Sequence, residues 1–80
     1  MKEKCGIYGI CSKNHDKYII NEAIDGLTSL QHRGQEGCGL VYLDTHHNYN
    51  LIKGLGLVKN IFHKNSLYTA SSMVIGHVRY

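Results

Sequence analysis

Cys5 stands close to the start of the chain, in the segment CGIYGI at residues 5–10. A thiol followed by glycine and alternating apolar residues predicts a nucleophile at the head of a buried strand. As the first residue of a mature chain, Cys5 would also carry a free α-amino group. That amine, with an ordinary pKa of about 7.7–8.0, could take the proton of its own thiol. Residues 1–4 precede Cys5, so this interpretation requires their removal, and we expect them to be a propeptide. The alternative is an ordinary buried thiol.

Two arginines are candidates for binding or orienting an anionic substrate. Arg79 lies in the segment GHVRY at residues 76–80. A guanidinium can hold the α-carboxylate of a free amino acid through two parallel charge-assisted hydrogen bonds. Arg33 lies in the segment LQHRGQE at residues 30–36. From spacing alone, a surface residue at a strand end is the favoured interpretation of Arg79, and Arg33 has the alternative of a solvated loop cation.

Four segments, at residues 5–10, 30–36, 54–58 and 76–80, resemble in order and spacing the start of the amidophosphoribosyltransferases. These enzymes are also called glutamine phosphoribosylpyrophosphate amidotransferases. The first and last segments are typical of all class II glutamine amidotransferases, whereas LQHRGQ points to this family. The resemblance implies an α+β fold, the four-layer αββα sandwich of N-terminal-nucleophile hydrolases. Only its first strands and helix would lie in this chain, so residues 5–80 would be an incomplete amidotransferase domain.

The resemblance also implies a reaction. The thiolate of Cys5 would attack the side-chain amide of glutamine, release ammonia and form a γ-glutamyl thioester that water hydrolyses to glutamate. A second domain, outside this chain, would join the ammonia to phosphoribosyl pyrophosphate and make 5-phosphoribosylamine. That step is the first committed one of purine (IMP) biosynthesis.

The same resemblance assigns roles to four further residues. Arg79 would clamp the α-carboxylate of glutamine, and Arg33 would orient the chain terminus and the glutamine loop. Gly6, lacking a Cβ, would leave room for substrate, and His77 would support the substrate site without acting as a base. Glu36 stands where the family usually has Asp, which keeps the charge on a longer arm.

Other parts that the resemblance implies fall outside this chain. The oxyanion donors, an Asn-Gly pair, would follow residue 80, so the 80 residues alone should fold poorly and be inactive. Mg²⁺ would belong to the phosphoribosyltransferase domain. The iron–sulfur cluster of some relatives would have its ligands beyond residue 80. The full-length protein is expected to be a homo-oligomer.

Two alternatives remain open. Another class II amidotransferase, such as glucosamine-6-phosphate synthase, typically has YRGYD where this chain has HRGQE at residues 32–36. The second alternative is a non-catalytic truncated remnant, which would keep the strands of the fold but have no enzymatic turnover.

The sequence contains six histidines, which could bind a metal ion. Their spacing matches no zinc-binding pattern, so no metal site is expected. Gly54 and Gly56 lack the third glycine of a nucleotide-binding loop and predict a turn.

The length and composition argue against nucleic-acid-binding, membrane and secreted proteins. Eighty residues make at most one small domain, and the net charge of +3 comes from scattered lysines without the basic run of a nucleic-acid site. The start is charged rather than apolar, and no stretch of about 18 apolar residues predicts a membrane span. Three cysteines and no signal peptide favour a cytoplasmic protein with reduced thiols.

The elements follow from hydrophobic periodicity. Residues 6–11 predict a strand and residues 12–17 a polar turn. Residues 18–30 predict a helix with an apolar face, which Asp16 could cap and in which Gly26 would allow close packing. We expect a loop at 32–37, where Gly34 and Gly37 permit positive φ, and strands at 39–43 and 51–53 joined as a hairpin. A turn into a short helical piece through residue 62 and a strand at 73–78 complete the prediction.

Overall fold

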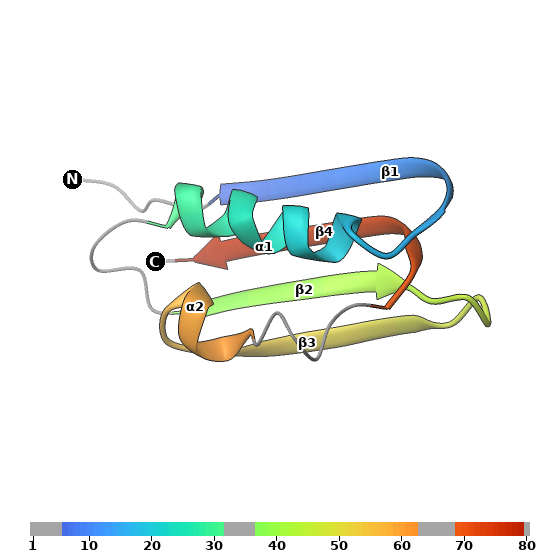
Figure 1. Cartoon of the computed structure of the whole chain (residues 1–80). Coiled ribbons are helices and arrows are strands. Elements are labelled where there is room, and N and C mark those ends of the chain that lie inside the picture. Colours follow the sequence, from blue (N-terminus) through green and yellow to red (C-terminus); the bar gives the residue numbers. More distant parts are fainter. Residues whose placement is uncertain (1–5, 32–36, 63–68, 80) are drawn as a thin grey trace.

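A computed structural model describes residues 6–31, 37–62 and 69–79 of the chain. Four antiparallel strands form one sheet in the order β1-β4-β2-β3 (Figure 1). The strands are β1 (Gly6–Asp16), β2 (Gly37–Leu43), β3 (Tyr49–Leu55) and β4 (Ser71–Arg79), and the helices are α1 (Ile19–Leu30) and α2 (Val58–Ile61). Both helices lie on the same face of the sheet, α1 over β1 and β4, α2 beside β2 and β3. The α+β class with an antiparallel sheet is confirmed.

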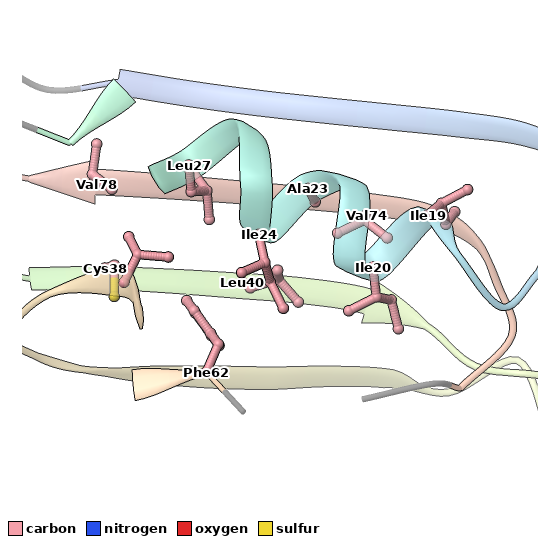
Figure 2. Packing of buried hydrophobic residues seen from close by; sticks show 11 residues of the cluster. Ile19, Ile20, Ala23, Ile24, Leu27, Cys38, Leu40, Phe62, Val74 and Val78 are labelled. Carbon is pink, nitrogen blue, oxygen red and sulfur yellow. The ribbon is translucent and has the colours of Figure 1, made fainter. Parts of the chain in front are cut away.

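The helix-covered face of the sheet holds the hydrophobic core. In α1 the apolar residues recur every three or four positions, which puts Ile20, Ala23, Ile24 and Leu27 on one buried side, as predicted. Figure 2 shows these side chains directed at β4 and β2. The strand residues that meet them alternate along their strands: Cys38, Leu40, Val74 and Val78.

Two close approaches fix α1 on the sheet. The ring of Tyr8 lies against Gly26, where an added Cβ would be 2.5 Å from Tyr8 Cζ. Leu27 lies against Gly76, where an added Cβ would be 2.6 Å from Leu27 Cδ1. The predicted close packing at Gly26 is therefore confirmed. At the start of α1, Asp16 Oδ1 accepts the Tyr18 N–H at 2.7 Å, although Tyr18 itself occupies the N-cap.

The opposite face of the sheet, called here the open face, is not covered by either helix. Alternating residues of the four strands point to it, and several large apolar ones are exposed. These are Ile7, Tyr49, Leu51, Leu55 and Ile75. Neither helix in the described part of the chain has the length and apolar character needed to cross a membrane.

The sequence-based boundaries were wrong at several places. Tyr49, Asn50 and Gly54, predicted in turns, lie in β3, because pairing with β2 continues from Tyr49 to Leu55. Residues 12–16, predicted as a turn, continue β1, with a register irregularity between Cys11 and Asp16. Polar residues fit there because β1 is an edge strand and these side chains meet water. Gly37, predicted in a loop, begins β2 and pairs with Leu55 and Arg79, because β2 lies between two partner strands. Among the described glycines, Gly56 has the positive φ, 119°.

The hairpin between β2 and β3 is organised by Asp44. Its Oδ1 accepts the N–H groups of His46 and Asn48 at 2.8 and 3.0 Å, and its Oδ2 accepts the Asn50 amide at 2.9 Å. The bonds from Asn48 and Asn50 hold the pKa of the Asp44 carboxyl below its ordinary value. His47 completes the turn with a φ of 65°. The predicted polar turn and hairpin are confirmed.

Candidate functional site

The candidate site lies at the end of the sheet where β1 begins and β4 ends (Figure 1). Strand pairing fixes the residues found there. Gly6, the first residue of β1, is opposite Val78, and Arg79 and His77 flank Val78 in β4. Across β4, Arg79 is opposite Gly37 and His77 is opposite Gly39. The first described residue after Cys5 therefore lies beside the two predicted site residues of β4.

A pocket of about 350 Å³ occupies this end of the sheet. It extends across three strands, from β4 over β2 to β3. Its lining consists of Gly37, Cys38, Lys53, Gly54, Leu55, His77 and Arg79. The pocket thus brings His77 and Arg79, both predicted from the sequence, together with a lysine that was not.

Two glycines of β2 make room for the side chains of β4. A Cβ added at Gly39 would lie 2.6 Å from His77 Nε2, so the imidazole rests against the backbone of Gly39. A Cβ added at Gly37 would lie 3.3 Å from Arg79 Cγ and 3.7 Å from Arg79 Cδ. The side chains of both residues therefore extend across β2 rather than away from the sheet.

The described lining of the pocket is basic. Lys53 and Arg79 carry positive charge at neutral pH, His77 lies with them, and none of the described lining residues is acidic. A pocket of this size and charge suits a small molecule with a carboxylate. Elsewhere, the described residues include no group of three His, Cys, Asp or Glu side chains that could hold a metal ion.

The structure describes only one of the three remaining predicted site residues, Cys5, Arg33 and Gly6. Cys5 and Arg33 lie outside the described residues, so their roles stay predictions. Gly6 is described, and a Cβ added there would meet Leu30 and Val78 at 3.3 Å. Its missing Cβ therefore makes room for these core neighbours, and a contact of Gly6 with substrate stays a prediction.

The two cysteines among the described residues, Cys11 and Cys38, lack the properties expected of the catalytic nucleophile. Cys38 is buried in the core, and this burial raises the pKa of its thiol, which disfavours the reactive thiolate. Cys11 is exposed in β1 opposite Met73, five residues along the strand from Gly6. Cys38 lies at the end of the sheet where β1 starts, opposite Val78, but its thiol is buried, whereas Cys11 lies away from that end.

Sequence reasoning missed Gly37, Gly39, Lys53 and Leu55 as parts of the site. The glycine pair at alternate positions of a strand was a usable signal, because alternate residues share one face. Lys53 had no comparable signal. Its place depends on the register of β3 on β2 and of β2 on β4, which joins residues far apart in the sequence.

The fold of this chain is similar to part of a known class of enzymes, the glutamine amidotransferases. The chain has the antiparallel α+β architecture found at the start of a glutamine amidotransferase: it superimposes on the solved glutamine phosphoribosylpyrophosphate amidotransferase from B. subtilis. The TM-score is 0.68 at 38% sequence identity, over 92% of this chain and 16% of the other. No protein-family profile matches the chain.

The chain is also similar in sequence to the N-terminal part of curated enzymes. The amidophosphoribosyltransferase of Pyrococcus horikoshii is 44% identical over 100% of this chain and 17% of its own length. That of Escherichia coli is 40% identical over 95% of this chain and 15% of its own length. The resemblance to the N-terminal part of the amidophosphoribosyltransferases is therefore confirmed. The chain spans about one sixth of the length of these relatives.

Proposed function

We propose that this chain is the N-terminal part of the glutamine-hydrolysing domain of an amidophosphoribosyltransferase. The observation that carries the proposal is the similarity over 92–100% of the chain, at 38–44% identity, to enzymes of this kind. The basic pocket beside the start of β1 supports it, because glutamine offers a carboxylate to bind. The relatives' names favour this family over glucosamine-6-phosphate synthase.

In the proposed reaction, the Cys5 thiolate attacks the side-chain carbonyl of glutamine. The carbon–nitrogen bond breaks, ammonia leaves with a proton from the terminal amine, and a γ-glutamyl thioester remains. Water then hydrolyses the thioester to glutamate and restores the thiol. The ammonia joins phosphoribosyl pyrophosphate in the part of the protein outside this chain, giving 5-phosphoribosylamine and pyrophosphate.

The proposed residue roles are those that the resemblance implies, and the pocket supports two of them. Arg79 holds the α-carboxylate, and His77, resting on Gly39, supports it. Arg33 orients the chain terminus, and Gly6 follows the nucleophile at the head of β1. Residues 1–4 are removed to free the amine of Cys5, and residues 5–80 form an incomplete domain that is inactive alone.

The remaining assignments concern the full-length protein. We place Mg²⁺ with the phosphoribosyl pyrophosphate site, and an iron–sulfur cluster, if present, outside these 80 residues. We propose a cytoplasmic homo-oligomer whose partners are its two substrates, with no nucleic acid or membrane among them.

The test compares two nitrogen sources in the full-length enzyme. Cys5→Ala should abolish turnover with glutamine and preserve turnover with ammonia, because ammonia needs no thioester. Arg79→Lys should lower glutamine kcat/KM by roughly 10- to 100-fold, since an ammonium lacks the planar fork and a charge-assisted bond is worth about 1.5–3 kcal/mol. Glutamine turnover that survives Cys5→Ala would refute the proposed function.

A further inference from the structure

Lys53 lies on the open face, two strands away from Arg79, yet lines the same pocket. Strand pairing gives two neighbouring rows across the sheet. One row joins Lys53, Gly39 and His77, and the next joins Leu55, Gly37 and Arg79. In both rows the central residue is a glycine, so no side chain of β2 separates β3 from β4 at this end.

The side chains of Lys53 and Arg79 line one pocket from the two sides of this gap. Neighbouring strands are about 4.8 Å apart, so the backbones of β3 and β4 are about 10 Å apart. Arg79 already extends across β2, because its Cγ and Cδ lie over Gly37. Lys53 lines the pocket from the opposite side. A ligand above the two glycines would therefore contact a guanidinium on one side and an ammonium on the other.

The positive charge of the pocket favours binding of an anionic ligand. Two cations facing one space repel each other, and none of the described lining residues offers a carboxylate to offset them. A ligand carboxylate has two oxygens, enough to accept hydrogen bonds from both groups at once.

We propose that Lys53 is a second binding residue for the α-carboxylate of glutamine, acting from β3 while Arg79 acts from β4. This inference rests on the proposed function. Free glutamine is the occupant that the position favours, because the row of Gly6, Val78, Cys38 and Gly54 runs between the two rows of the pocket. The carboxylate site thus lies beside the strand that Cys5 precedes.

The experiment uses the full-length enzyme and the variant Lys53→Met, which keeps the length of the side chain and removes its charge. KM for glutamine should rise about 10-fold, the effect of losing one charge-assisted bond. Lys53→Arg should stay within about threefold of wild type. Glutaminamide, which has no α-carboxylate, should be turned over equally by wild type and Lys53→Met. Lys59→Met, on α2 at the covered face, is the matched control and should change nothing.

Ammonia-dependent turnover separates binding from structural damage. The inference predicts that it persists in Lys53→Met. An unchanged KM for glutamine, or an equal loss of glutamine and ammonia turnover, would overturn the role of Lys53. If Cys5→Ala abolishes glutamine turnover while Lys53→Met leaves KM unchanged, only this inference fails. If Cys5→Ala keeps glutamine turnover, the proposed function fails with it.

Discussion

The covered and open faces of the sheet are built from the same four strands but obey different constraints. On the covered face, alternate residues are apolar and buried against α1 and α2. On the open face, the intervening residues include glycines, exposed apolar side chains and the cations of the pocket. The comparison shows that hydrophobic burial explains the covered face, whereas side-chain reach and charge explain the pocket on the open face.

On each face a side chain lies closely over a glycine of a neighbouring element, but the surroundings of the two side chains differ. Leu27 lies over Gly76 and His77 over Gly39, each 2.6 Å from where a Cβ would be. Leu27 is fully buried among core side chains, whereas His77 is exposed. The core side chain has nowhere to move, and the imidazole has solvent beside it. Tight contact therefore means rigidity on the covered face and adjustable placement on the open face.

The largest expected difference between the faces comes from removing a leucine. Leu27→Ala should lower the free energy of unfolding of the 80-residue chain by about 2–5 kcal/mol, because it leaves a cavity in the core, and should leave this weakly stable chain largely unfolded. Leu51→Ala, at a residue 58% exposed on the open face, should change it by less than about 0.5 kcal/mol. Urea denaturation followed by circular dichroism measures both. Equal losses would mean that the open face is packed in solution.

A smaller difference should follow from adding one methyl group. Gly76→Ala should destabilise the chain by about 1–3 kcal/mol, because Leu27 cannot yield. Gly39→Ala should stay within about 0.5 kcal/mol of wild type, because His77 can swing into solvent. Gly9→Ala is the control, since its added Cβ would meet only Val74 O at 3.8 Å. The same denaturation assay applies, and a Gly39→Ala loss matching that of Gly76→Ala would contradict the contrast.

The smallest effect concerns a polar group on the covered face. Asn21 is buried in α1, and its amide nitrogen and oxygen find no hydrogen-bond partner within the described residues. Burying an unpaired amide costs about 1–3 kcal/mol, so Asn21→Leu should stabilise the chain by about 1 kcal/mol. Asn14→Leu, at an exposed position of β1, should not. The midpoint of thermal unfolding checks this, and a lower midpoint for Asn21→Leu would show that the amide has a partner in solution.

The contrast also explains what the sequence could predict. The period of Ile20, Ala23, Ile24 and Leu27 identified α1 and its buried side, because burial alone determines that pattern. The extension of β1 past Cys11 was missed, because its polar residues resemble a turn unless an edge strand is already known.

The site was predicted less completely. His77 and Arg79 were found through a motif, and the structure places both in one pocket. Lys53 was not found, because its place in the pocket with Arg79 depends on pairings between three strands rather than on local spacing. Cys5 and Arg33 lie outside the described residues and stay predictions.

The central claim, that catalysis starts at the residue preceding β1, is tested most directly by covalent labelling. A glutamine-analogue electrophile, diazo-oxo-norleucine, is reacted with the full-length protein, and the modified cysteine is located by mass spectrometry. The account predicts one adduct, at Cys5, in a chain that has lost residues 1–4. Cys38 should stay unmodified because it is buried with a raised thiol pKa, and Cys11 because it lies away from the pocket. Equal labelling of all three cysteines, or an active protein that retains Met1, would contradict the account.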